Sequence, residues 1–510
     1  MAKESQEAAE EIVSGVEAVP LIEDIEQEPV ALTENESDVE ANRAAKQGLI
    51  PSTEDEPGAE TDTDPDAAPG ERRHLVKSAA LVSIGNLGSS LMGMVRQVAV
   101  ASLGAQFGGP FNAALTPANN FFQLLVNGSV SGALVPTFND FAAPAKRQEM
   151  RRLVFTVVNL ILVIALISAV IYALIAPWFV NILVPGYNAT DKLLTLQYSQ
   201  IIFFSLAALG PFAVLLSALF ALKEFGWPAF ATAAYHVGII LGSIGVSVFG
   251  SSFLGKMALP VGVLIGAVGE IALLFPGIRK QRLYYMFVLD FKHPALRRIL
   301  KLYFPIFVSF VFTTLQVFLD VSLWSQAPGS GTANTLAQTT ATALLQFPVG
   351  LVALALSTAV LPTLSEHARE GNTERFKQTL LLGFRVGLML MIPAMVGMWV
   401  LRSPIVYLLF AHRNNSIANA GLSALALQNY VYQLPFVAMD QLLIAAFYAR
   451  KNTRTPVVIG IVCIGFYLLV ALPFFKTIGI PALAFANTVQ NSSHAIILLF
   501  LLRGAIGSLH

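Results

Sequence analysis

Apolar runs of roughly 20 residues recur at regular spacing between residues 78 and 502. A run of this length is what an α-helix needs to cross the hydrocarbon core of a bilayer. The chain is 55% hydrophobic and 13% charged, whereas soluble domains carry about 25% charged residues. The pattern predicts an all-α integral membrane protein and disfavours its alternative, a very apolar soluble core.

About twelve spans are predicted. They lie at residues 78–103, 110–140, 153–178, 197–222, 228–250, 256–278, 303–325, 334–363, 380–401, 420–448, 456–475 and 479–502. The loops after even-numbered spans carry most of the bases, such as the four between residues 146 and 152 and the three between 450 and 454. Because positive charge marks cytoplasmic loops, both termini are expected in the cytoplasm.

The stretch up to Gly70 holds most of the acidic residues of the chain and only three of its basic ones, Lys3, Arg43 and Lys46. Such a segment has too few apolar side chains to fold by itself. It lacks the basic start and apolar core of a signal peptide. Residues 1–72 are therefore predicted to be a disordered acidic cytoplasmic tail, and a docking or regulatory role for the tail is the alternative.

Two short patterns occur twice, and the two pairs are separated by nearly the same offset along the chain. The segment ALVPTFNDFA at 133–142 matches AVLPTLSEHA at 359–368, and ALFALK at 218–223 matches AFYARK at 446–451. The repeat predicts two parallel six-helix lobes, at 73–282 and 303–510, around a central site. Residues 283–302 are basic and amphipathic, and we expect them to form a cytoplasmic linker on the membrane surface.

Arg96 is the most informative charged residue, because it lies inside the first predicted span among small residues. An arginine at membrane depth is costly unless it faces a watery cavity or a partner. Its planar guanidinium suits a bidentate contact with a phosphate group. The alternative is a structural arginine that reaches the outer interface.

Other polar residues inside the spans are candidates for substrate binding or for hydrogen bonds between helices. They are Asn112, Asn119, Asn120 and Gln123 in the second span, Asp320 in the seventh, Arg385 in the ninth, and Asn487 and Asn491 in the twelfth. Asp320 could pair with Arg96 across the lobes or take a proton or cation. Glu270 and Asp440 are further acids that could face the cavity, and Arg385 could also anchor lipid headgroups.

Known catalytic and metal-binding patterns are not recognisable in the sequence. His236 and His494 lack ligand spacing to another His, Cys or acid, so no metal site is predicted. No phosphate-binding glycine loop or catalytic triad is recognisable. The chain is therefore predicted to be neither an enzyme nor cofactor-dependent, and ion gradients or the membrane potential would drive its work.

Four segments resemble the MurJ/MviN family of lipid II flippases, within the multidrug/oligosaccharidyl-lipid/polysaccharide exporter superfamily. They are GMVRQVAVASLGA, LLVNGSVSGALVPTF, QFPVGLVALALSTAVLPTLSEHAREGN and FYARKNTRTPV. The resemblance covers roughly residues 78–505. It implies that the chain moves the lipid-linked peptidoglycan precursor across a bacterial cell (plasma) membrane by alternating access, and so serves cell wall biogenesis and cell shape.

The family's polar residues are matched in part. Its second arginine of the first span aligns with Arg96, and its first falls on Ser90. The arginine that the family has in its eighth span aligns with Ala343 here. Gln346 and the Phe-Pro that follows it fix this alignment, and Gln346 is a further candidate for substrate binding. Asp320 matches the acid of sodium-coupled members, but the eleventh span has no carboxylate or asparagine. The family usually has fourteen spans, so the last pair is expected to be missing here.

Two other functions stay open. A transporter of this architecture could export another polyprenyl-linked polysaccharide intermediate or a drug, and the charge of the cavity would distinguish these cargoes. A non-transporting membrane scaffold could instead recruit cell-wall synthesis proteins through the acidic tail. In the flippase interpretation the partners are a lipid-linked saccharide diphosphate and the bilayer, with no nucleic acid.

Overall fold

The computed structural model describes residues 85, 88–129, 134–250 and 252–507, and the predicted tail at 1–72 lies outside them. The described residues are helical apart from short turns and one extended segment, and none of them is in a β-strand. The all-α prediction is therefore confirmed. The helices fall into two lobes of about six spans each.

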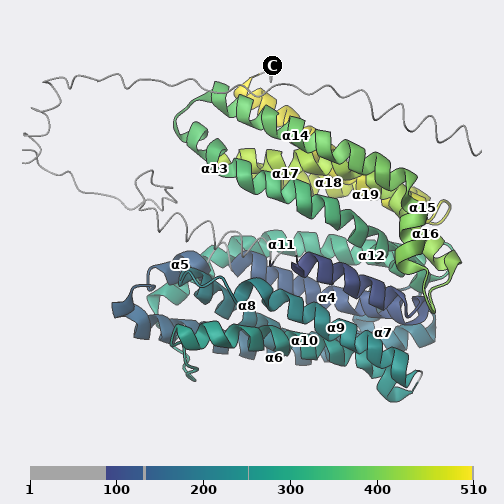
Figure 1. Cartoon of the computed structure of the whole chain (residues 1–510), viewed down its shortest axis with the longest axis horizontal. Helices are drawn as coiled ribbons and strands as arrows, with labels where there is room; N and C mark the ends of the chain where they lie inside the picture. The colour runs from purple at the N-terminus through teal and green to yellow at the C-terminus, as the bar shows by residue number, and fades with distance from the viewer. Residues whose placement is uncertain (1–84, 86–87, 130–133, 251, 508–510) are drawn as a thin grey trace, which may run out of the picture. The chain divides into compact units, whose positions relative to one another are not determined.

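The N-terminal lobe begins with a helix over residues 88–101. It continues with α4 (Ala105–Ser129), α5 (Val135–Asn139), η2 (Pro144–Lys146), α6 (Arg147–Leu183), α7 (Ala189–Phe203), α8 (Leu206–Ala221), α9 (Pro228–Phe249) and α10 (Phe253–Lys280). In Figure 1 these helices run from purple to teal and lie beside one another.

The C-terminal lobe begins with a helix that starts inside the predicted linker. Its elements are α11 (Pro294–Gln326), α12 (Gly331–Pro348), the π-helical turn η3 (Val349–Leu354), α13 (Ala355–Arg369), α14 (Thr373–Val400), α15 (Arg402–Phe410), α16 (Ile417–Tyr430), η4 (Val431–Gln433), α17 (Leu434–Ala449), α18 (Arg454–Phe474) and α19 (Ile480–Ile506). Of these, α11 and α12 pack against α4 of the first lobe (Figure 1).

Nine helical stretches in the described part of the chain are long and apolar enough to cross a membrane. The other three predicted spans correspond to the helix at 88–101, α4 and α11, which border or contain residues outside the full description. Several helices extend past the predicted apolar runs, as α6 does at both ends. The apolar run marks only the part of a helix inside the hydrocarbon, and the polar turns beyond it stay helical.

The two lobes repeat the same order of elements. The starts of α4 and α12 are separated by the same offset along the chain as the starts of α6 and α14, and by almost the same offset as those of α7 and α16. The caps repeat too: the side chain of Asn188 accepts a hydrogen bond from the Asp191 N–H, and that of Ser416 accepts one from the Asn419 N–H. An oxygen at this position satisfies an N–H that the first turn leaves free. The predicted internal repeat is therefore present in the fold.

Close packing inside the N-terminal lobe depends on small residues. At the crossing of α9 and α10, a Cβ on Gly242 would lie 2.6 Å from the Ala258 carbonyl oxygen, and one on Gly262 would lie 2.5 Å from the Gly238 carbonyl oxygen. Small residues at such a crossing let two backbones meet inside a membrane. Large apolar side chains such as Leu174 and Val248 point outward instead, as lipid-facing side chains do.

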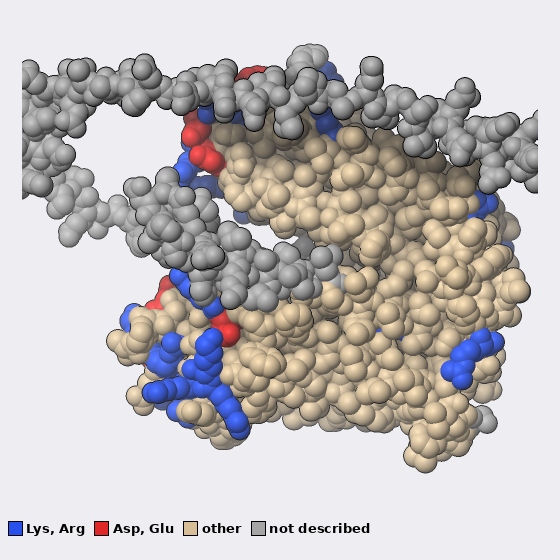
Figure 2. Space-filling model, viewed as in Figure 1, with Lys and Arg blue, Asp and Glu red and all other residues tan. Residues whose placement is uncertain are grey.

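Charged side chains gather at the ends of the helices. Figure 2 shows a wide uncharged belt between them, with a dense cluster of basic residues at one end of the N-terminal lobe. Salt bridges join the loops at this end: Arg298 to Asp140 at 2.7 Å and Arg152 to Asp290 at 3.2 Å. The loops that follow the second and sixth spans thus meet at one end, as the charge pattern requires.

The segment between the lobes is held by the N-terminal lobe. Residues 283–290 are extended, and the buried Asn159 of α6 donates hydrogen bonds to the carbonyls of Met286 at 3.2 Å and Val288 at 3.0 Å. Tyr285 donates to the Asn159 side-chain oxygen at 3.1 Å. The rest of the predicted linker forms the first turns of α11, whose Leu296 is buried in the core of the N-terminal lobe.

Candidate functional site

Polar side chains meet where α12 crosses the first lobe. Asn112 on α4 donates a hydrogen bond to the Thr339 hydroxyl oxygen at 2.9 Å, and Gln97 on the preceding helix donates to the same oxygen at 3.3 Å. Thr339 belongs to α12, so one hydroxyl joins both lobes. Asn112 and Gln97 are buried, which strengthens hydrogen bonds by excluding water.

Arg96 precedes Gln97 on the helix at 88–101. Its Nε is buried and has no hydrogen-bond partner among the described residues. The guanidinium lies within electrostatic range of Tyr235 and His236 on α9. A buried, unpaired guanidinium N–H is a costly arrangement without a ligand, and its geometry suits a phosphate or carboxylate.

The predicted polar residues of α4 have different hydrogen-bond partners. Asn119 accepts a hydrogen bond from the Tyr235 hydroxyl at 3.3 Å, while Asn120 donates to the Thr116 carbonyl at 2.9 Å within its own helix. Gln123 is exposed. The structure thus brings Asn119 and Arg96 to the same α9 neighbour and leaves Asn120 bonded to its own helix.

In the described structure Asp320 bonds within the C-terminal lobe, and Arg96 is not among its hydrogen-bond partners. Its carboxylate accepts hydrogen bonds from the Gln338 side chain at 2.6 Å and from the Tyr467 hydroxyl. Both donors belong to the C-terminal lobe, on α12 and α18. The carboxylate of Asp320 is thus satisfied by side-chain donors from two neighbouring helices of its own lobe, and Arg96 is not among them.

The C-terminal lobe contains a row of further polar pairs between helices. Asn491 donates to the Gln433 side-chain oxygen at 2.5 Å and to the Asn487 side-chain oxygen at 3.1 Å. His494 meets the Asp440 carboxylate at 2.6 Å and the Pro456 carbonyl at 3.0 Å. These contacts join α19 to η4, α17 and α18, as interhelical hydrogen bonds do inside membranes.

The remaining candidates stand apart from these groups. Arg385 and Gln346 have exposed side chains. Glu270 is buried on α10, and its Oε2 has no hydrogen-bond partner in the described structure. Groups of three or more His, Cys, Asp or Glu that could hold a metal ion are not found among the described residues.

Backbones of the two lobes touch at the end opposite the basic cluster. The Asn414 N–H donates to the Ser102 carbonyl at 3.1 Å, and a Cβ added to Gly109 would lie 2.5 Å from the Thr332 carbonyl oxygen. Tyr187 and Thr335 share a hydrogen bond between their hydroxyls. Burial raises the pKa of the Tyr187 phenol, so the hydroxyl keeps its proton. These contacts close the lobes together at that end.

Thr339, Gln97, Gln338 and Tyr467 were not predicted as site residues. Thr339 and Gln338 lie in the run TANTLAQTTATALLQ, which is unusually polar for a membrane span. That polarity is a sequence signal for a buried hydrogen-bonding face. Tyr467 lies in the apolar run IVCIGFYLLV, where its hydroxyl gives no comparable signal.

The sequence comparisons with known proteins point to one family. A family model described as lipid II flippase MurJ matches residues 100–508. A relative named probable lipid II flippase MurJ, from Bdellovibrio bacteriovorus, is 25% identical over 447 residues, covering 85% of this chain and 83% of the relative. A protein with the same name from Rhizobium meliloti is 26% identical and covers 83% of this chain and 80% of its own length.

Solved structures show the same fold. One titled lipid II flippase MurJ in an inward closed conformation aligns with a TM-score of 0.71 at 22% identity, over 83% of this chain and 87% of that one. An inward-facing multidrug resistance transporter of the MATE family aligns with a TM-score of 0.70 at 14% identity, over 82% and 95%. These structures show that the chain has a fold that several transporters share. The family model, in contrast, identifies one family within that fold. The chain belongs to the lipid II flippase MurJ family.

Proposed function

We propose that this protein moves lipid II from the inner to the outer leaflet of a bacterial plasma membrane by alternating access. The observation that carries the proposal is the Nε of Arg96, which is buried and has no hydrogen-bond partner among the described residues. Lipid II is a polyprenyl diphosphate, and a guanidinium is the side chain best suited to bind its oxyanions. Membership of the MurJ family supports this choice of substrate.

The proposed cycle starts from the arrangement seen here. The lobes touch at the Ser102–Asn414 and Gly109–Thr332 contacts, which face outward if the basic loops are cytoplasmic. The headgroup enters from the cytoplasm and its diphosphate binds Arg96. The lobes then part at the outer contacts and close at the basic end, while the lipid tail stays in the bilayer.

Thr339 is proposed to link substrate binding to this movement. Gln97 follows Arg96 directly, and its amide holds the Thr339 hydroxyl across the lobe boundary. A diphosphate that draws Arg96 toward itself moves Gln97 as well, because both lie on one helical turn. Loss of the hydrogen bonds to Thr339 would then release the lobes.

The other predicted residues are proposed for lesser roles. The amides of Asn119, Asn120 and Gln123 would bind sugar hydroxyls when the headgroup is present. The exposed Arg385 and Gln346 would contact the headgroup during entry. Asn487 and Asn491 are proposed to support the C-terminal lobe, because their side chains are engaged with one another and with Gln433.

We propose that ion gradients or the membrane potential supply the energy for transport. The protein is proposed to have no catalytic activity. A charge that crosses the membrane potential gains about 2.3 kcal/mol per 100 mV, which biases the flip of a diphosphate. Both termini are proposed to be cytoplasmic. The domain limits proposed are a tail at 1–72, lobes at 73–282 and 303–510, and a linker at 283–302.

Reconstitution tests the substrate directly. Full-length protein in liposomes should move fluorescent lipid II to the opposite leaflet, while Arg96→Ala at equal content should not. An undecaprenyl-linked polysaccharide intermediate and a cationic drug serve as competing cargoes. Movement of either cargo in place of lipid II would instead make the chain an exporter of that cargo. If no cargo moves, and deletion of residues 1–72 alone abolishes function in cells, the chain is a scaffold.

A further inference from the structure

A pocket lies on the same end of the molecule as the contacts between the lobes. Its volume is about 830 Å³. Segments from both lobes line it, including the start of α7, the ends of α9 and α10 that meet at their turn, and the turn between α15 and α16. The pocket is separate from Arg96 and from the hydrogen bonds to Thr339, which line no part of it.

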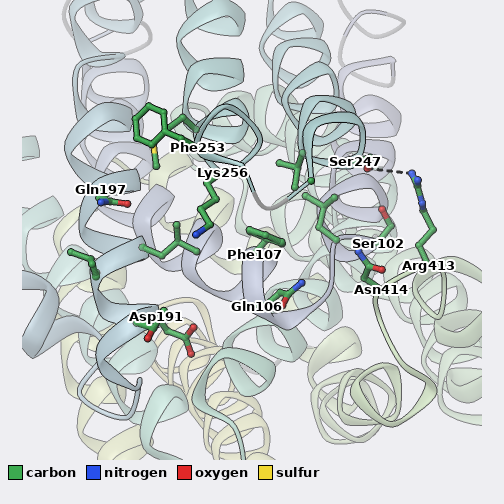
Figure 3. Close-up of a pocket in the computed structure, with 17 residues that line it drawn as sticks. Ser102, Gln106, Phe107, Asp191, Gln197, Ser247, Phe253, Lys256, Arg413 and Asn414 are labelled. Carbon is green, nitrogen blue, oxygen red and sulfur yellow. Dashed lines mark hydrogen bonds between the residues drawn. The ribbon is translucent and has the colours of Figure 1, made fainter.

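Two cations and several amides give the pocket its chemistry. Figure 3 shows Lys256 extending into the space near Gln197 and Phe107, with Arg413 on the opposite side. Arg413 donates one hydrogen bond to the Ser247 hydroxyl at 3.2 Å, which fixes the guanidinium at the rim. Lys256 and Arg413 outnumber the one lining carboxylate, Asp191. The pocket therefore favours an anion that also carries hydroxyl donors.

The rim of the pocket is partly apolar and exposed. Phe253 is 73% exposed and Leu193 54%, and both line the pocket. Leu254, which is 68% exposed, follows Phe253 at the start of α10. Exposed apolar side chains at the end of a membrane span lie in the interfacial and acyl region of the bilayer. A ligand here would place an anionic head in the pocket and acyl chains against this rim.

We propose that this pocket binds the headgroup of an anionic, hydroxyl-bearing phospholipid from the outer leaflet. The phosphate would lie between Lys256 and Arg413. The headgroup hydroxyls would donate to Asp191. Because the two cations belong to different lobes, the bound lipid stabilises the closed outer contacts and opposes their opening. The proposal uses the orientation given under the proposed function and does not need lipid II transport to be correct.

Lipid binding to full-length protein in detergent tests the proposal without any transport step. Phosphatidylglycerol is titrated against wild type, Lys256→Gln and Lys192→Gln, with bound lipid counted by native mass spectrometry. Lys192 is the matched control, because it lies beside Asp191 in the sequence and does not line the pocket. Loss of one charged contact is expected to weaken binding by about tenfold in Lys256→Gln, with Lys192→Gln unchanged.

Two other ligands test whether the pocket binds an anionic lipid, any lipid, or a free phosphate ester. Phosphatidylcholine, which is zwitterionic and lacks free hydroxyls, should bind much more weakly than phosphatidylglycerol. Glycerol phosphate should also be weak, because it has no acyl chains for the rim. Equal phosphatidylglycerol binding by wild type and Lys256→Gln overturns the site. Equal binding of phosphatidylcholine overturns the selectivity, and equal binding of glycerol phosphate shows a free-anion site instead of a lipid site.

Discussion

Lys223 and Lys451 occupy equivalent positions in the two lobes and adopt the same left-handed backbone conformation, with φ of 57° at both. Each lies just beyond the end of a helix, and the residue after each donates its N–H back to a carbonyl of the last turn: Glu224 to Leu219 and Asn452 to Phe447, both at 2.9 Å. This is a Schellman-type helix end. The same strained position in both lobes is a structural trace of the internal repeat.

Substitution at these two lysines should change stability in parallel. A left-handed conformation costs an L-residue roughly 1–2 kcal/mol, and it is most unfavourable for β-branched side chains. Valine at Lys223 or Lys451 should lower the melting temperature in detergent, and glycine should raise it or leave it unchanged. A valine that destabilises one lobe and leaves the other unaffected would contradict the equivalence.

Thr339→Val should loosen the contact between the lobes. The change keeps the shape of the side chain but removes the oxygen that accepts from Asn112 and Gln97. Leaving two buried donors unpaired costs about 1–3 kcal/mol each. With cysteines at Ser102 and Asn414 in a Cys463→Ala background, disulfide formation should slow by at least about tenfold.

Thr342→Val is the matched control for this experiment. Thr342 lies one turn further along α12, and within the described structure its hydroxyl donates to carbonyls of its own helix, those of Gln338 and Thr339. Its replacement should leave the crosslinking rate close to that of wild type. Equal slowing by both variants would mean that α12 is perturbed generally and that Thr339 is no specific link.

Tyr467→Phe should destabilise the C-terminal lobe. The hydroxyl of Tyr467 donates to the Asp320 carboxylate, which also accepts from the Gln338 side chain. Loss of one hydrogen bond to a charged group costs about 1.5–3 kcal/mol, so the thermal midpoint should fall. The half-exposed Tyr448 is the control, and Tyr448→Phe should leave the midpoint unchanged. A Tyr467→Phe protein as stable as wild type would contradict a stabilising role for this hydrogen bond.

Gly109→Ala should prevent full closure of the outer contact. An added Cβ would lie 2.5 Å from the Thr332 carbonyl oxygen, a separation that the two backbones can relieve only by moving apart. Gly88→Ala is the control, because a Cβ there meets nothing within 4 Å. Thiol labelling of a cysteine at Ser102 should become faster in Gly109→Ala and stay unchanged in Gly88→Ala.

Sequence patterns were sufficient for the membrane class, the spans and the repeat, because the length and period of apolar runs are imposed by the bilayer. They could not place α15, since Arg402 and the short run after it resemble an ordinary loop. They also could not decide the partner of Asp320. The spacing of residues within one helix says nothing about which neighbouring helix supplies Gln338 or Tyr467, so the sequence left a pair with Arg96 open.

For Arg96, the sequence identified the residue but could not identify its neighbours. Its position inside an apolar run made it a candidate from the sequence. Only the structure shows that its Nε is buried without a hydrogen-bond partner among the described residues, and that the next residue, Gln97, donates to Thr339. The role of Arg96 in binding a diphosphate stays a prediction, and so do the roles proposed for Asn119, Asn120 and Gln123.

Complementation of a bacterium depleted of its own lipid II flippase tests the central claim most directly. Wild type, Arg96→Ala and Arg96→Lys are compared at equal membrane levels. We expect wild type to restore growth, Arg96→Ala to fail, and Arg96→Lys to restore it weakly, because lysine keeps the charge and loses the bidentate geometry. Failure of well-expressed wild type, or full rescue by Arg96→Ala, would contradict the account.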